Sequence, residues 1–94
     1  MFILGILRED FDNMTKYEDQ FNCLIATACK RQFNVPYAEE WFDEVSVGSS
    51  QYVHTKFNHE AFRSHQFQEL LSKVENVTDP KELVHTFILT PIEI

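Results

Sequence analysis

Glycine, proline and positive charge are all scarce in this sequence. Its 94 residues include only two glycines and three prolines, and no stretch has low complexity. This composition argues against linkers and disordered segments, which are usually rich in residues that cannot form a packed core. We therefore expect residues 1–94 to form a single globular domain without internal repeats.

Basic residues are outnumbered by acidic ones. Eight lysines and arginines stand against fifteen aspartates and glutamates, which gives a net charge of −7. A chain with this charge repels nucleic acids and anionic membranes and attracts basic protein surfaces. We expect a basic protein as its partner, and no direct binding to nucleic acid or to a membrane.

We also expect no segment that directs the chain to or across a membrane. The opening apolar run, MFILGIL, is too short for a membrane span, and acidic residues follow it at once. Cys23 and Cys29 would point to different sides of a helix, which disfavours a disulfide or a shared metal site. These features predict a soluble, cytoplasmic protein.

Motifs that carry catalytic or metal chemistry are lacking as well. Four histidines are spread along the chain without the spacing of zinc ligands: His54, His59, His65 and His85. Glu9, Asp10 and Asp12 follow an apolar run, but they lack the spacing and glycine of a calcium loop. We expect no catalytic residue, no metal site and no cofactor. A small metal-dependent hydrolase that uses these acids or the histidines is an alternative.

Apolar patterns predict an α+β fold. Residues 2–7 and 85–94 are apolar enough for two strands that could pair, and residues 51–57 alternate as a third strand does. Helical spacing is expected over 15–33, from Pro36 to the residues before Gly48, and from about Asn58 to Glu75. The expected fold is a small sheet of about three strands with two to three packed helices.

The second expected helix carries the candidate binding site. On a helical wheel its apolar residues, Trp41 among them, share one side, while the other side carries four carboxylates: Glu39, Glu40, Asp43 and Glu44. Each like-charge pair at i,i+4 costs about 0.2–0.5 kcal/mol, and the helix has no basic residue to offset it. A positive partner surface would explain the charges. The alternative is a merely solvated face, with Trp41 holding the helix to the core.

These observations predict a small acidic module that inhibits or regulates a basic partner protein. Phage-type inhibitors and antitoxin- or immunity-like proteins are examples, and the partner could be a nucleic-acid-binding enzyme or a toxin. In one version the carboxylates imitate the phosphates of DNA. The alternative is a structural subunit or scaffold that docks through the acidic patch. A homodimer through an apolar terminal strand is also compatible with the sequence.

Overall fold

The computed structural model describes residues 2–14, 21–41, 44–49, 52–59 and 67–92. In this part of the chain, five strands form one antiparallel sheet in the order β1-β5-β4-β3-β2. The strands are β1 (Phe2–Leu7), β2 (Tyr37–Trp41), β3 (Glu44–Ser49), β4 (Tyr52–His59) and β5 (Leu83–Pro91). The helices are α1 (Arg8–Asn13), α2 (Leu24–Phe33) and α3 (Phe67–Val74).

The mixed α+β character is as expected, but the expected sheet of about three strands is wrong, because the sheet has five. The two additional strands come from the acidic stretch that we expected to be a helix. Its two halves form β2 and β3, which pair from Tyr37 opposite Gly48 to Trp41 opposite Glu44. Gly48 has a φ of 156° and lies at an irregularity in the β3–β4 register, a position that favours glycine.

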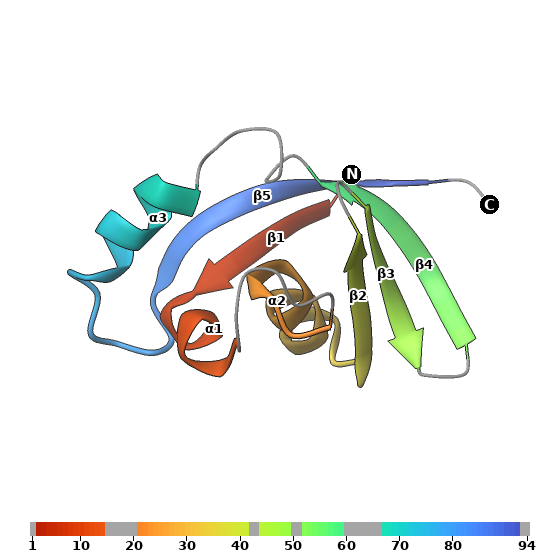
Figure 1. Ribbon diagram of the computed structural model, residues 1–94, viewed down its shortest axis with the longest axis horizontal. Coiled ribbons are helices and arrows are strands. Elements are labelled where there is room, and N and C mark those ends of the chain that lie inside the picture. Colours follow the sequence, from red (N-terminus) through yellow and green to blue (C-terminus); the bar gives the residue numbers. More distant parts are fainter. Residues whose placement is uncertain (1, 15–20, 42–43, 50–51, 60–66, 93–94) are drawn as a thin grey trace.

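The two terminal strands pair with each other, as their apolar sequences suggested. Phe2 lies opposite Leu89 and Leu4 opposite Phe87. At its other edge β5 pairs with the end of β4, where His59 lies opposite Leu89. The sheet therefore continues from the β1–β5 pair into the β4–β3–β2 meander, and the whole sheet curls (Figure 1).

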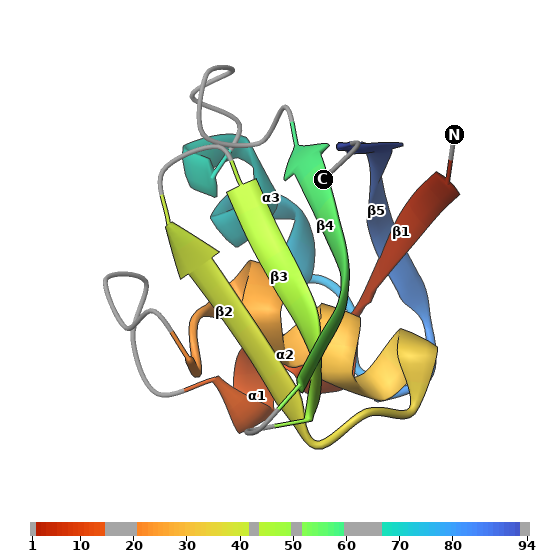
Figure 2. The same cartoon turned by 90° about the vertical axis from the view of Figure 1, so that its right-hand side faces the viewer.

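Helix α2 lies inside this curl, on the face that we call the inner face. Six consecutive residues, Leu24 to Cys29, are buried, so the first part of the helix is enclosed on all sides rather than on one stripe. Figures 1 and 2 show the helix between the two arms of the curled sheet. The sequence predicted a helix here with an earlier start. Residues 15–20 lie outside the described residues, and α2 begins after Cys23.

The core joins α2 to side chains that alternate along the strands. Leu4, Ile6, Phe87 and Leu89 are fully buried on the β1–β5 arm, and Val45 is fully buried on β3. At the edge of this core three phenylalanine rings meet. Phe33 of α2 stacks on Phe57 of β4 at 5.6 Å, and the edge of Phe2 meets Phe57 at 5.4 Å.

An ion pair between Asp10 and Arg31 ties α1 and α2 to β1. Arg31 Nε lies 2.9 Å from Asp10 Oδ1, and Arg31 Nη2 lies 3.0 Å from Asp10 Oδ2. Asp10 Oδ2 also accepts the backbone N–H of Leu7 at 2.8 Å, in the manner of the acidic residue of a capping box. This contact begins the short helix α1 directly after β1.

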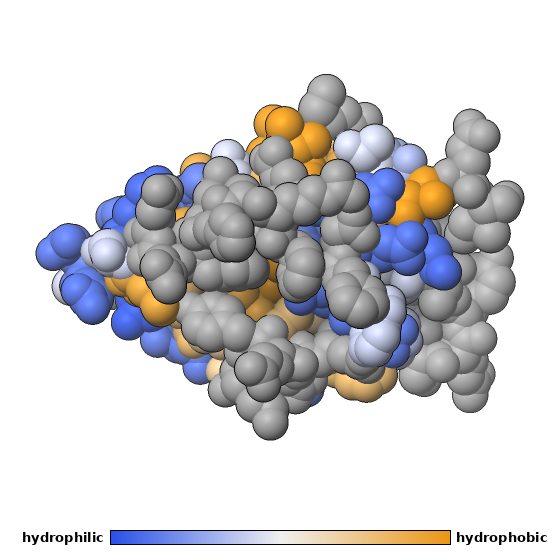
Figure 3. All heavy atoms as spheres, turned by 45° about the horizontal axis from the view of Figure 1, so that its top comes forward, coloured by the Kyte–Doolittle hydropathy of each residue, from blue (hydrophilic) through white to orange (hydrophobic). Residues whose placement is uncertain are grey.

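Large apolar side chains also reach the surface. Those that are described as exposed are Phe2, Ile3, Phe21, Trp41, Leu71, Leu83 and Ile88. Among the residues coloured in Figure 3, hydrophobic ones form separate patches between hydrophilic ones. Scattered exposure of this kind is ordinary for a soluble fold, so a single exposed apolar side chain indicates no binding site by itself.

The Asp10–Arg31 contact gives the first prediction. Replacing Asp10 with alanine removes the partner of Arg31 and the acceptor for Leu7 N–H, and should lower the free energy of unfolding by about 2–4 kcal/mol. This is somewhat less than for a fully buried pair, because 28% of the Arg31 side chain is exposed. Denaturant titration measures the loss.

Asp12 is the matched control on the same helix. It pairs with Arg8 at 2.8 Å, but 56% of its side chain is exposed, so Asp12→Ala should cost less than about 1 kcal/mol. Equal losses in the two variants would contradict the central role of Asp10.

Candidate functional site

The residues of the expected binding site lie on both faces of β2. Side chains alternate along a strand, so Ala38 and Glu40 point to the inner face, and Glu39 and Trp41 point to the outer face. Ala38 is 1% exposed, whereas Trp41 is 55% exposed. The expected helix with all its carboxylates on one side is therefore wrong.

Glu39, Trp41 and Glu44 remain together on the outer face, and we call them the hairpin patch. Trp41 lies opposite Glu44 across the β2–β3 pair, and Glu39 precedes Trp41 by two residues on the same side of β2. Figure 2 looks onto this part of the sheet, with α2 and α3 behind it. Asp43, the fourth expected carboxylate, lies outside the described residues.

The described residues of the chain only partly compensate the negative charges of the hairpin patch. The pKa of the Tyr37 hydroxyl is raised, first by desolvation and then by the negative charge of the neighbouring Glu39 carboxylate. Lys56 lies opposite Ser46, which in turn lies opposite Glu39, so one basic residue shares the outer face. Among the described residues, no lysine or arginine forms an ion pair with Glu39 or Glu44.

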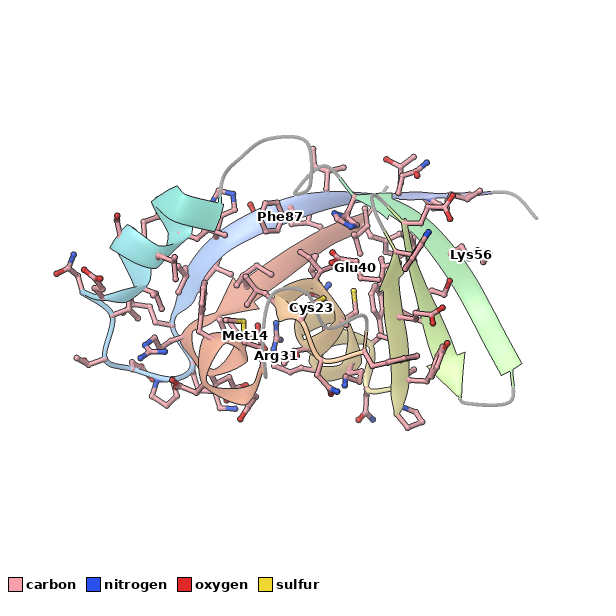
Figure 4. All side chains as sticks on the ribbon, in the orientation of Figure 1. Met14, Cys23, Arg31, Glu40, Lys56 and Phe87 are labelled. Atoms are coloured by element: carbon pink, nitrogen blue, oxygen red, sulfur yellow. The ribbon has the colours of Figure 1, made fainter. Side chains whose placement is uncertain are left out.

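Glu40 belongs to a different site, a buried polar cluster with Cys23 and His59. The Cys23 thiol donates to Glu40 Oε1 at 3.3 Å, and His59 Nε2 lies 2.9 Å from Glu40 Oε2. The three residues come from the start of α2, from β2 and from the end of β4. Figure 4 shows Cys23 and Glu40 close together inside the curl, with Lys56 on the far side of the sheet.

Burial controls the chemistry of this cluster. Desolvation, followed by the negative charge of Glu40, raises the pKa of Cys23 to about 12, so the thiol stays protonated at neutral pH. Cys23 is 2% exposed, and the His59 side chain is fully buried. The thiol donates a hydrogen bond to one carboxylate oxygen of Glu40 and keeps its proton, while the His59 imidazole lies against the other oxygen. A buried, protonated thiol is a poor nucleophile, so the arrangement favours a structural role for Cys23.

Sequence reasoning did not identify this cluster, because its members are far apart in the chain. The Cys23–Glu40 contact spans 17 residues. One signal for the inward position of Glu40 was available. Val45 and Val47 alternate with Glu44 and Ser46, which is the period of a strand, and β-branched residues favour strands.

The acids after β1 are held by basic residues of the same chain. Asp10 pairs with Arg31, Glu9 Oε2 lies 2.8 Å from Lys81 Nζ, and Asp12 pairs with Arg8. In the described ranges no group of three or more histidine, cysteine, aspartate or glutamate side chains is placed to hold a metal ion.

The structure describes the side chains of two of the four histidines, His59 and His85, and these two contact different residues. His59 is buried in the cluster with Glu40. His85 Nδ1 lies 3.5 Å from Lys73 Nζ, and its ring meets that of Phe87 at 4.8 Å. His65 and the side chain of His54 lie outside what the structure describes.

Comparisons with protein-family models, curated proteins and solved structures gave no match for this chain. No helix among the described residues combines the length and the apolar character that crossing a membrane requires.

The opposite orientations of Glu39 and Glu40 give the second prediction. Glu40→Ala should lower the free energy of unfolding by about 1–3 kcal/mol, because it leaves the buried His59 imidazole and Cys23 thiol without their partner. Glu39→Ala, on the outer face, should change it by less than about 0.5 kcal/mol. Denaturant titration of the two variants measures both, and similar values would contradict the strand assignment.

The raised pKa of Cys23 gives the third prediction. The unfolded thiol loses its proton near its ordinary pKa of 9.0, and the folded thiol only near 12, so stability is lost as the pH rises between these values. Other groups also titrate there, so the test is a comparison. The decline in unfolding free energy from pH 8 to pH 11 should be smaller in Cys23→Ala than in the wild type. An identical decline in both proteins would show that Cys23 is not protected as described.

Proposed function

We propose that this protein is a small acidic binding module that docks on a basic surface of another protein and inhibits or regulates it. The observation that carries the proposal is the hairpin patch, in which a 55% exposed Trp41 lies directly opposite Glu44 and two residues from Glu39. Tryptophan is enriched among the hot spots of protein interfaces, and here it lies beside two carboxylates.

The composition of the patch suits arginine and lysine side chains. A guanidinium or ammonium group can lie on the indole ring of Trp41 while a neighbouring carboxylate accepts its hydrogen bonds. The net charge of −7 adds long-range attraction, which speeds the encounter with a basic partner.

The same features bear on the class of partner. A basic protein that itself binds nucleic acid, or a basic toxin, would carry the arginines and lysines that the patch fits. The hairpin supports docking through one ring and a few charges more directly than it supports imitation of a phosphate row, because Glu40 faces the core. A structural subunit that docks through the patch is the alternative. Loss of the partner's activity on binding distinguishes a regulator from such a subunit.

The proposal gives the fourth prediction, for a pair of double variants. Glu39→Lys with Glu44→Lys reverses the charges of the hairpin patch. Glu75→Lys with Glu82→Lys reverses the charges of two exposed acids elsewhere on the protein. Both double variants change the net charge equally, since each turns two acids into two lysines. The Glu75→Lys/Glu82→Lys variant should capture the same proteins from host extract as the wild type. The Glu39→Lys/Glu44→Lys variant should capture at least tenfold less of them.

Trp41 also reports binding directly, because it is the only tryptophan of the chain. Acrylamide quenching of its fluorescence should decrease when a captured protein is added in purified form. The proposal fails if both double variants retain the same proteins, or if binding leaves the quenching of Trp41 unchanged.

A further inference from the structure

Strand β1 lies at one end of the sheet, so one of its edges has no neighbouring strand among the described residues. In an antiparallel pair, every second residue of an edge strand directs its backbone N–H and C=O away from the partner. On β1 these residues are Ile3, Gly5 and Leu7. An edge of this kind is a template for pairing with another strand.

Side chains of α2 and α1 occupy this edge. Gln32 Nε2 donates to Ile3 O at 2.8 Å, and Gln32 Oε1 accepts from Gly5 N at 2.8 Å. Arg31 Nη2 donates to Gly5 O, and Asp10 Oδ2 accepts from Leu7 N at 2.8 Å. The Gln32 carboxamide thus offers one donor and one acceptor in the way that a peptide group of an added strand would.

We propose that Gln32, supported by Arg31 and Asp10, stands in for a sixth strand and keeps β1 from pairing with β1 of a second copy. The sequence of β1, FILGIL, has no charged residue and no proline, so it lacks the devices that usually protect an edge strand. Two identical strands can also pair antiparallel about a twofold axis, which makes a second copy the natural occupant. The homodimer that the terminal strands suggested is blocked at this edge.

The experiment removes the bonds of Gln32 while leaving the helix intact, and it is the fifth prediction. Gln32 is exposed, and alanine and methionine both favour helices, so Gln32→Ala and Gln32→Met should fold. Methionine also keeps the length of the side chain. In sedimentation equilibrium the apparent mass of both variants should rise with concentration toward twice the monomer mass of 11.1 kDa. The apparent mass of the wild type should rise far less.

Amide exchange at Gly5 shows whether any association uses β1. In dilute Gln32→Ala the Gly5 amide should exchange roughly 2- to 10-fold faster than in the wild type, since it has lost its acceptor. In concentrated samples it should become protected again. Gln32→Glu is the matched control, because it keeps an acceptor for Gly5 N–H and adds a charge that opposes pairing of edges.

Three results would overturn the proposal. One is that both variants sediment as the wild type does at every concentration. Another is an association of the variants in which the Gly5 amide stays unprotected, because the copies would then meet through another surface. The third is a Gln32→Glu variant that associates as strongly as Gln32→Ala.

Discussion

The bidentate contact between Asp10 and Arg31 is the interaction on which the arrangement of this fold depends. Asp10 lies three residues after the end of β1, and Arg31 lies near the end of α2, so their contact spans 21 residues of chain. One oxygen of Asp10 also fixes Leu7 N–H, and Arg31 reaches Gly5 O. The pair therefore sets where α2 lies along β1. Without it, a buried carboxylate and a guanidinium would each need another partner.

The position of α2 in turn decides which polar groups are buried at its other end. Its first residues enter the closed part of the curl, where Cys23 meets Glu40 and, through Glu40, His59. A carboxylate in an apolar core is tolerated only when hydrogen bonds or charges compensate its lost hydration. The sheet can therefore admit Glu40 on its inner face because α2 and β4 supply a thiol and an imidazole at the same place.

Local patterns were sufficient for part of this fold. The terminal strands, the strand before residue 60 and the buried helix after Cys23 could be predicted, because each has a strong apolar pattern of its own. The stretch from Tyr37 to Gly48 could not, because its apolar residues fit two periods. Ala38, Trp41 and Val45 share a helical face, whereas Ala38, Val45 and Val47 share the inner face of a hairpin. The pairing of β3 with β4 favours the hairpin. A helical-wheel analysis considers the stretch by itself and so does not include this tertiary contact.

Of the candidate site, Glu39, Trp41 and Glu44 are still on one surface, but the physical basis of the proposed binding has changed. A helix would have presented a row of carboxylates, with affinity dominated by charge. The hairpin presents an indole ring beside two carboxylates on the outer face of the sheet, so the shape of the ring limits which cations fit. Arginine suits this surface better than lysine, because its planar guanidinium can stack on the indole and donate in the same plane to a carboxylate. Recognition by the hairpin patch would therefore select for the geometry of a partner's arginines rather than for its total positive charge.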